Sequence, residues 1–411
     1  MENVSSRCGK SDNAPRLRFP EFRGEWVEKK LGEIFKKNTE KNTELKITNV
    51  ICNSAKNGLI PQREYFDKDI ANSENINGYY IIQKYDFVYN PRKSTEAPYG
   101  PVSVYKYPDK GIVSPLYLCF RATEKINSDF YEFYFKSSSW HRYIYLSGDN
   151  GARHDRVSMR DDVFFAMPVN IPSLPEQKKI AAFFTLLDRR IQKQRQFVER
   201  LKTYKRGVID KFFCNNSYDF ELYRLEEIGK FIRGLSYKED EQTYDNQKTL
   251  VLRSNNIRDN GFLNYKEGLQ FVTKIPDCEQ LLQKNDLVFC MANGSSKLVG
   301  KNAVYDGRYN GKITVGTFCC IYRSKFHILQ YYFQSSLFQK TLGKIQQGGG
   351  GSIGNLKPSD LEPLIVKLPN KYTQEKIFNC LSFFDSYIKL HENKLSSLLS
   401  LKSSLLQKMF I

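Results

Sequence analysis

Residues 180–213 read IAAFFTLLDRRIQKQRQFVERLKTYKRGVIDKFF, and residues 377–410 read IFNCLSFFDSYIKLHENKLSSLLSLKSSLLQKMF. In both stretches apolar residues recur at alternating spacings of four and three, which is the pattern of a coiled-coil seam. The apolar positions of the predicted seam are Ile180, Phe184, Leu187, Ile191, Val198, Leu201, Val208 and Phe212 in the first stretch and Ile377, Leu381, Phe384, Ile388, Leu395, Leu398, Leu405 and Met409 in the second. The two seams keep the same phase, so we predict two long helices that arise from an internal repeat.

Polar residues occupy the remaining seam positions: Gln194 and Lys205 in the first stretch, His391 and Lys402 in the second. Such residues typically set the register of a coiled coil, and a catalytic or ligand-binding role is the alternative. The two helices can pair with each other in antiparallel fashion, or each can pair in parallel with a second chain. One chain holds both seams at high effective concentration, which favours the antiparallel pair within the chain.

The composition is that of a folded, basic protein. The 411 residues are 40% hydrophobic, and 63 Lys+Arg against 45 Asp+Glu give a formal charge of +18 and a pI of about 9.3. Such a surplus favours a polyanionic partner. We expect a cytoplasmic protein, because the N-terminus is polar and no run of about 18 apolar residues could span a membrane. The nine cysteines show no CxxC spacing, so we expect reduced, mostly buried thiols.

Each helix follows a globular segment, and the two segments share motifs. Residues 30–34 correspond to 224–228, residues 86–89 to 286–289, and residues 133–138 to 331–336. Residues 79–82, 87–89 and 116–120 are short β-prone runs, and residues 130–145 form an aromatic-rich helical pattern. The predicted fold is α+β: two mixed α/β domains, related by a pseudo-twofold axis and joined by two long antiparallel coiled-coil helices. The expected bounds are 1–15 for a flexible N-terminus, 16–173 and 214–370 for the domains, and 174–213 and 371–411 for the helices.

Several motifs resemble those of one known family, the DNA-specificity subunits of type I restriction-modification systems. The start of the family's sequences is similar to residues 15–22 and 30–33, and the start of their first long helix is similar to residues 175–191. The framework of their target-recognition domains resembles residues 254–257 and 299–301. The resemblance covers nearly the whole chain after residue 15. One departure is that the second helix opens with residues 372–377, which lack the Pro-Glu of the first, and this weakens the capping argument there.

The resemblance implies that each domain reads one half of a split, asymmetric DNA target. It further implies that the helices set the gap between the half-sites and bind two modification subunits. Two restriction subunits, acting as ATP-dependent translocase and nuclease, are optional further partners. The assembled complex would use S-adenosylmethionine, ATP and Mg, with no cofactor in this chain. The alternative is a coiled-coil adaptor that binds proteins and has no DNA specificity.

Three loop stretches offer side chains that can read DNA. Arg and Lys suit guanine, Asn and Gln suit adenine, and Ser suits either base. The predicted contacts are Asn90, Arg92, Lys93 and Ser94 in the first stretch, Arg153, His154 and Arg156 in the second, and Asn293, Ser295, Ser296 and Lys297 in the third. Solvated turns are the alternative reading, since Asn, Pro, Gly and Ser are also ordinary turn residues. The first helix carries eleven Lys and Arg against four acids, and this surplus could face DNA, solvent or a partner.

Catalytic motifs are missing. Residues 90–93 share only their first two residues with the Asn-Pro-Pro-Tyr motif of amino-methyl transfer, and residues 348–354 lack the Lys-Ser/Thr of a phosphate-binding loop. The four histidines have no metal-ligand spacing. We therefore predict a chain without a catalytic or metal site, whose enzymatic activities reside in partner subunits.

Overall fold

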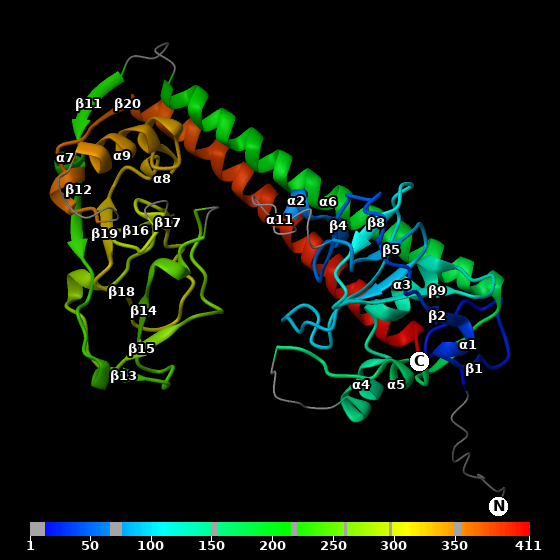
Figure 1. The fold of residues 1–411 in the computed structure, drawn as a ribbon. Helices are drawn as coiled ribbons and strands as arrows, with labels where there is room; N and C mark the ends of the chain where they lie inside the picture. The colour runs from blue at the N-terminus through cyan, green and yellow to red at the C-terminus, as the bar shows by residue number, and fades with distance from the viewer. Residues whose placement is uncertain are drawn as a thin grey trace, which may run out of the picture. The chain divides into compact units, whose positions relative to one another are not determined.

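The computed structural model describes residues 13–65, 76–148, 155–214, 220–258, 261–295, 298–348 and 355–411. The chain divides into two compact units (Figure 1). Unit 1 comprises Met1–Lys193 together with Lys394–Ile411, and unit 2 comprises Gln194–Asn393. Each unit therefore contains a mixed α/β domain and a portion of each long helix.

Unit 1 is built on a four-stranded antiparallel sheet with the order β2-β9-β6-β7. Its strands are β2 (Phe35–Lys37), β9 (Leu118–Ala122), β6 (Phe87–Tyr89) and β7 (Val102–Val104). The paired strands β1 (Val27–Lys30) with β10 (Pro168–Ile171), β3 (Ile51–Ser54) with β4 (Gly58–Pro61), and β5 (Tyr80–Ile82) with β8 (Gly111–Val113) accompany it. The short helices are α1 (Leu31–Ile34), α2 (Gln62–Tyr65), α3 (Ser128–Lys136), α4 (His141–Ser147) and α5 (Asp161–Phe165).

Unit 2 has a matching four-stranded antiparallel sheet, β12-β19-β16-β17, and a second sheet, β13-β15-β14-β18. The strands of the first sheet are β12 (Gly229–Arg233), β19 (Cys319–Ser324), β16 (Leu287–Cys290) and β17 (Asn302–Val304). The strands of the second sheet are β13 (Gln242–Thr243), β15 (Gln270–Val272), β14 (Thr249–Leu252) and β18 (Ile313–Val315). Strands β11 (Phe220–Arg224) and β20 (Ile365–Pro369) form a further pair. The short helices are α7 (Leu225–Ile228), η2 (Glu239–Glu241), η3 (Ser254–Asn256), η4 (Cys278–Gln280), α8 (Leu329–Tyr332), α9 (Ser336–Gly348) and α10 (Pro358–Leu361).

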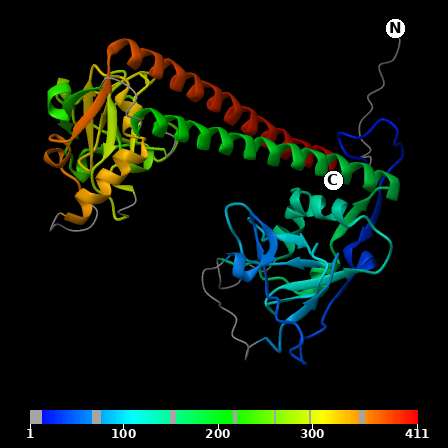
Figure 2. The ribbon, with the colours of Figure 1, turned by 90° about the horizontal axis from the view of Figure 1, so that it is seen from above.

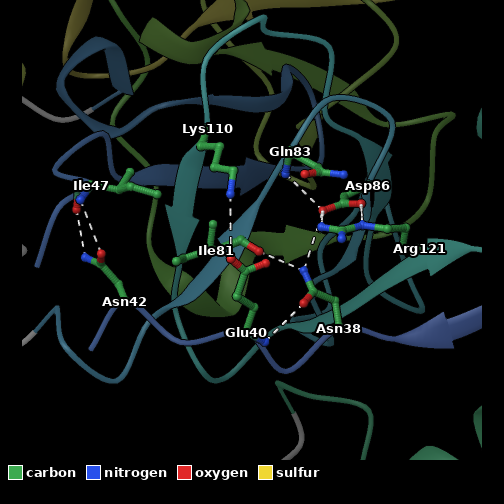
Figure 3. Close-up of polar contacts among 9 residues, drawn as sticks. All are labelled: Asn38, Glu40, Asn42, Ile47, Ile81, Gln83, Asp86, Lys110 and Arg121. Carbon is green, nitrogen blue, oxygen red and sulfur yellow. Dashed lines mark hydrogen bonds and ion pairs between the residues drawn. The ribbon is translucent and has the colours of Figure 1, made fainter. Parts of the chain in front are cut away.

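Two local features show that the units share a framework, as the repeated motifs predict. The carboxylate of Glu33 accepts the backbone N–H of Lys30 at 2.9 Å, and Glu227 caps α7 in the same way at 2.7 Å. A buried carboxylate is paired with an arginine of the neighbouring strand in both sheets: Asp86 with Arg121, and Asp286 with Arg323. Figure 3 shows the guanidinium of Arg121 facing both oxygens of Asp86.

Two predicted elements are wrong in their limits. The aromatic-rich pattern at 130–145 is two helices, because the serines between them bond locally: Ser137 Oγ donates to Tyr134 O at 2.6 Å and accepts from Ser139 N at 3.3 Å. The β-run at 116–120 begins later, at Leu118, because Tyr117 N donates to Ser114 O at 3.0 Å and closes a turn. Residue 116 is therefore a turn residue.

The long helices are α6 (Leu174–Cys214) and α11 (Lys371–Met409). In each unit, residues of α6 with increasing sequence numbers contact residues of α11 with decreasing sequence numbers. The two helices are therefore antiparallel in each unit. In unit 1, Phe184 lies beside Phe410 and Asp188 pairs with Lys402 at 2.6 Å. In unit 2, Gln194 Nε2 lies 2.9 Å from His391 Nδ1, and Lys205 pairs with Asp385 at 2.5 Å. The antiparallel pair within one chain is confirmed; the pseudo-twofold relation between the domains stays a prediction.

The predicted seam residues lie on the paired faces. Nine of the sixteen apolar seam residues are buried, namely Ile180, Phe184, Leu187, Ile191, Val198, Ile377, Leu381, Ile388 and Met409. The other seven are half-buried, namely Leu201, Val208, Phe212, Phe384, Leu395, Leu398 and Leu405. The seam continues into the domain cores: Phe410, the residue after α11, packs in unit 1, and Phe213 of α6 packs in unit 2. Figures 1 and 2 show the end of α11 (red) adjoining unit 1 and the end of α6 (green) adjoining unit 2.

The two helices begin with different caps. At the start of α6, the buried carboxylate of Glu176 forms an ion pair with Arg18, in which each oxygen accepts one guanidinium N–H at 2.7 Å. The same carboxylate accepts the indole N–H of Trp26 at 3.3 Å. At the start of α11, where the Pro-Glu motif is missing, the side chain of Asn370 accepts the N–H of Thr373 at 3.0 Å. An asparagine N-cap therefore replaces the motif.

The remaining expectations concern membrane spans and cysteines. Among the described residues, the structure contains no helix with the length and apolarity needed to cross a membrane. Of the eight described cysteines, all of them free, four are buried (Cys119, Cys290, Cys319 and Cys320), Cys52 is half-buried and three are exposed (Cys214, Cys278 and Cys380). The expectation of mostly buried thiols thus holds for half of them.

Candidate nucleic-acid interface

The predicted loop of unit 1 begins where β6 ends. Asn90 anchors it, because its amide donates to Asn53 O at 3.0 Å while its side-chain oxygen accepts the N–H of Arg92 at 3.1 Å. Arg92, Lys93 and Ser94 are exposed beyond this anchor. Asn90 is half-buried, and its side-chain bonds hold the loop in place. The exposed residues that follow it are available to a ligand.

The fold brings the second predicted stretch against the first. Lys93 N donates to Asp155 O at 2.8 Å, Val157 N donates to Pro91 O at 2.9 Å, and Arg92 and Arg156 form an antiparallel bridge. Arg92 and Arg156 therefore contribute to one surface although they are distant in sequence. The other two predicted residues of this stretch, Arg153 and His154, lie outside the described residues.

These loops border a cleft of about 540 Å³. Its lining includes Asn53, Lys56, Asn57, Arg92, Lys93, Glu96, Leu116, Tyr117 and Arg156. Arg92 and Arg156 each lie 3.9 Å from Asp155, a separation at which exposed ion pairs contribute little. The cleft therefore keeps a basic surplus, which suits a phosphate backbone.

Two cleft residues have defined polar roles. Asn53 is buried, and its amide donates to Val88 O at 2.7 Å while Ser103 donates to its side-chain oxygen at 2.8 Å. Asn53 thus holds the cleft floor. Burial raises the pKa of Tyr117 above its ordinary value, so its hydroxyl remains protonated and able to donate a hydrogen bond.

Unit 2 presents a corresponding loop after β16. The amide of Asn293 donates to Ser254 Oγ at 3.1 Å, and its oxygen accepts Ser295 N at 3.0 Å. Asn293 is half-buried and Ser295 is exposed, whereas the predicted residues Ser296 and Lys297 lie outside the described part of the chain. A cleft of about 480 Å³ lies beside this loop, lined by Tyr237, Arg253, Ser254, Asn255, Gly316, Thr317, Phe318 and Cys319.

The sheet register aligns the two loops residue by residue. Phe87 pairs with Phe120 in unit 1, and Leu287 pairs with Tyr322 in unit 2. Five residues after Phe87 and Leu287, beyond the ends of β6 and β16, Arg92 bridges to Arg156 and Ala292 bridges to Asn355. Asn293 therefore occupies the framework position of Lys93, one residue after the bridge in each loop.

A glycine is required beside each loop. Gly100 and Gly300 both have positive φ, of 82° and 83°, and a Cβ on Gly100 would lie 2.1 Å from Asn90 O. Only glycine permits this close approach of two backbones. The shared glycine shows that the loops leave the same framework although their side chains differ.

The basic residues of α6 divide into two groups. Lys205 is buried against Asp385, and half-buried Lys202 pairs with Glu199 and Glu392 at 3.2 and 2.9 Å. The other nine Lys and Arg of the helix are exposed. Lys205 also donates to Gln334 at 3.2 Å, which makes it part of the helix-to-domain contact within unit 2.

Sequence reasoning missed the cleft residues Lys56, Asn57, Leu116 and Tyr117. The first two follow β3 in a polar turn, a weak signal, and the last two were assigned to a strand. In the described residues no group of three or more His, Cys, Asp or Glu side chains could hold a metal ion.

Known proteins match this chain at the level of family and fold. The profile described as type I restriction modification DNA specificity domain matches residues 23–200 and 218–400. The type I restriction enzyme StySPI specificity subunit of Salmonella potsdam is 28% identical over 173 residues, which cover 39% of this chain and 36% of that protein. The match thus spans little more than a third of that relative's length.

Two solved structures share the fold. The S subunit of a type I restriction-modification system from M. genitalium has a TM-score of 0.54 and 15% identity, over 97% of this chain and 99% of that chain. A chain from a structural study of complex assembly and conformational transition of the type I R-M system has a TM-score of 0.58 and 15% identity, over 93% and 96%. Because the specificity-domain profile matches once in each half and covers most of the residues, this chain belongs to the type I restriction-modification DNA specificity family.

Proposed function

We propose that this chain is the sequence-specific DNA-binding subunit of a type I restriction-modification complex. The domain at residues 16–173 reads one half of a split, asymmetric target, and the domain at residues 214–370 reads the other. The helices at 174–213 and 371–411 set the gap between the two half-sites, as dimer geometry sets half-site spacing in other DNA-binding proteins.

One observation carries this proposal: two equivalent clefts stand on one framework and present different side chains. The same buried Asp–Arg pairs, capped short helices and positive-φ glycines support both. Exposed Arg92 and Lys93 line the cleft of unit 1, and exposed Asn255 lines the cleft of unit 2. Lysine suits guanine or a phosphate and asparagine suits adenine, so the two domains are suited to different half-sites.

We assign DNA contacts to the predicted residues around the clefts whose side chains are accessible. Exposed Arg92, Lys93 and Ser94 with half-buried Arg156 serve the first half-site, and exposed Ser295 serves the second. We keep Arg153, His154, Ser296 and Lys297 as proposed contacts from their place in the sequence. Asn90 acts as a positioning residue, since its side chain is committed to Asn53 and to the backbone of Arg92. Asn293 acts in the same way, since its side chain is committed to Ser254 and to the backbone of Ser295.

The helices provide the surface that we assign to modification subunits. Within unit 2, the rings of Phe383 and Tyr387 stack at 6.0 Å, and Phe197 lies 6.4 Å from Tyr387. All three are exposed, Phe383 by 66%. Clustered exposed aromatics typically mark protein interfaces. In unit 1, Leu186 stands at the repeat position of Phe383 and is also exposed, so a second, aliphatic surface suits a second subunit.

Catalysis belongs, in this proposal, to the partner subunits. The modification subunits supply the methyl transfer from S-adenosylmethionine, and restriction subunits, where present, supply the ATP- and Mg-dependent steps. This chain contributes recognition and geometry and holds no cofactor. We place the complex in the cytoplasm, where its DNA substrate is.

Mapping of methylated adenines tests the proposal. Genomic DNA is compared between cells that carry this chain with its modification subunit and cells from which this chain is deleted. We expect the deletion to remove methylation at one split, asymmetric motif. An unchanged methylation pattern would contradict the specificity role.

Exchange of one domain tests the assignment of half-sites. Residues 218–368 are replaced by the corresponding segment of another family member, and methylation is mapped again. We expect one half-site to change while the other half-site is retained. A motif that changes in both halves would refute the model of two independent readers.

Salt dependence separates a DNA reader from a protein-binding adaptor. Binding of the purified complex to its mapped duplex is measured over a series of salt concentrations. The logarithm of the affinity should fall linearly with the logarithm of salt, with a slope of about 0.9 per neutralised phosphate. An adaptor without DNA specificity would show equal, weak affinity for the target and for a scrambled duplex.

A further inference from the structure

Each domain carries one large apolar side chain at the tip of a tight turn beside its cleft. In unit 1 the turn is closed by Tyr117 N, which donates to Ser114 O at 3.0 Å, and Leu116 is 61% exposed. In unit 2 Cys319 N donates to Gly316 O at 2.8 Å, and Phe318 is 68% exposed.

The register shows that these two residues are equivalent. The turns lead directly into β9 and β19, in which Phe120 and Tyr322 occupy matching positions opposite β6 and β16. Leu116 and Phe318 each lie four residues before that matching position. An isolated exposed leucine needs no explanation, but an exposed apolar residue at the same point of two diverged domains is a shared feature.

Packing in unit 1 and backbone hydrogen bonds in unit 2 hold the two turns in place. In unit 1, Tyr117 packs on the cluster that includes Val88 and Cys119. In unit 2, the carbonyl of Phe318 accepts the N–H groups of Met291 and Ala292, at 2.8 and 3.2 Å. These bonds tie the turn to the start of the Asn293 loop. Turns of this kind usually carry polar or glycine residues at their tips, so the turn conformation does not require an apolar side chain.

Both side chains line the clefts among polar neighbours. Leu116 borders the same cleft as Arg92, Lys93 and Arg156, and Phe318 borders the cleft of Arg253, Ser254 and Asn255. Polar side chains of these types can bond to the edges of bases. The thymine C5-methyl is the base group of the major groove that an apolar side chain contacts.

We propose that Leu116 and Phe318 are specificity-determining residues that contact thymine methyl groups, one in each half-site. This inference rests on the proposed function, because it requires that the clefts face the major groove. Insertion between base steps is the other use of apolar side chains on DNA, and the experiment below distinguishes the two.

Replacement of thymine by deoxyuridine tests the contact, because it removes the methyl group and leaves the hydrogen-bonding pattern unchanged. Each thymine of the mapped target is replaced singly, and the affinity of the full complex is measured. We expect one position in the half-site of domain 1 to weaken binding about fourfold, which corresponds to the transfer of one methyl-sized group. That sensitivity should vanish in Leu116→Ala and persist in Leu116→Met.

Phe318→Ala provides the matched control. It should abolish methyl sensitivity in the second half-site and leave the sensitivity of the first half-site intact, and Leu116→Ala should do the converse. Because both side chains are exposed, the variants should fold, which thermal unfolding of each variant verifies.

Three results are informative. If deoxyuridine has no effect at any position, the proposal is wrong. If Leu116→Ala weakens the thymine and deoxyuridine duplexes equally, the side chain inserts between bases or supports the loop, and the methyl contact is refuted. If the unsubstituted complex does not prefer its mapped target to a scrambled duplex, the proposed function itself fails.

Discussion

The end of α11 and the residue that follows it, Phe410, should stabilise the domain of unit 1, and Phe410→Ala tests this. The ring of Phe410 is 2% exposed and lies 5.3 Å from the ring of Phe130, 5.9 Å from that of Phe184 and 6.3 Å from that of Tyr134. The helix end is thus part of an aromatic core that belongs to a domain about 280 residues earlier in the sequence.

The expected cost follows from the burial. Truncation of a buried phenylalanine to alanine typically costs about 3–5 kcal/mol, and the cost is lower where the cavity can collapse. Phe410 follows the last helical residue, Met409, so the chain there can relax. We therefore expect a loss near 3 kcal/mol in the free energy of unfolding of unit 1, roughly a hundredfold in its equilibrium constant.

Tryptophan fluorescence reports on this unit selectively. The chain has two tryptophans, and both Trp26 and Trp140 are buried in the same core as Phe410. Urea unfolding followed by fluorescence should show a lower midpoint for Phe410→Ala. Leu399→Ala, an exposed position on the same helix, is the control and should change stability by less than about 0.5 kcal/mol. A loss below about 1 kcal/mol for Phe410→Ala would refute the assignment of the helix end to the core.

Three further predictions concern DNA binding, the helix pair and the partner surface. Arg92→Ala should reduce the slope of log affinity against log salt by about 0.9 if it contacts one phosphate, while Lys36→Ala, an exposed lysine on β2, should leave the slope unchanged. Lys205→Met leaves the carboxylate of Asp385 without its 2.5 Å partner and should cost about 3 kcal/mol in thermal or urea unfolding, whereas adding Asp385→Leu should recover most of the loss. Phe383→Ser should reduce co-purification of the modification subunit without lowering the melting temperature, because the ring is exposed; unchanged co-purification would place the partner elsewhere.

The helices were predictable because their signal is local and repeated. A seam with a period of 3.5 residues fixes which face of a helix is buried, and residues 180–191 and 377–388 follow it closely. The order of strands in the sheets was not predictable, since β2 pairs with β9 across more than 80 residues and such contacts leave no periodic pattern. The break in the 130–145 helix depends on serine side chains that bond to the local backbone, a competition that propensity alone does not decide.

The candidate site was partly predictable. Loops rich in Asn, Arg and Lys after β-runs indicated the region of Asn90–Lys93, but the sequence could not separate an anchoring residue from an exposed one. Asn90 and Asn293 are both tied to neighbouring segments, by bonds of 3.0 and 3.1 Å. Leu116 was assigned to a strand because apolar and aromatic residues follow it. Only the hydrogen bond from Tyr117 to Ser114 reveals the turn.

The two clefts differ in how they can gain affinity. The first is lined by Lys56, Arg92, Lys93 and Arg156, whereas Arg253 is the charged residue that lines the second among its described residues. Phosphate contacts supply affinity that does not depend on sequence and weakens with salt, while amide and hydroxyl contacts to base edges supply discrimination. Because the framework beneath both clefts is the same, we expect a substitution of an exposed loop residue to change the side chain that the loop presents and to leave the sheet in place. Among the described cleft residues, we therefore expect those of domain 1 to supply more of the salt-dependent affinity than those of domain 2.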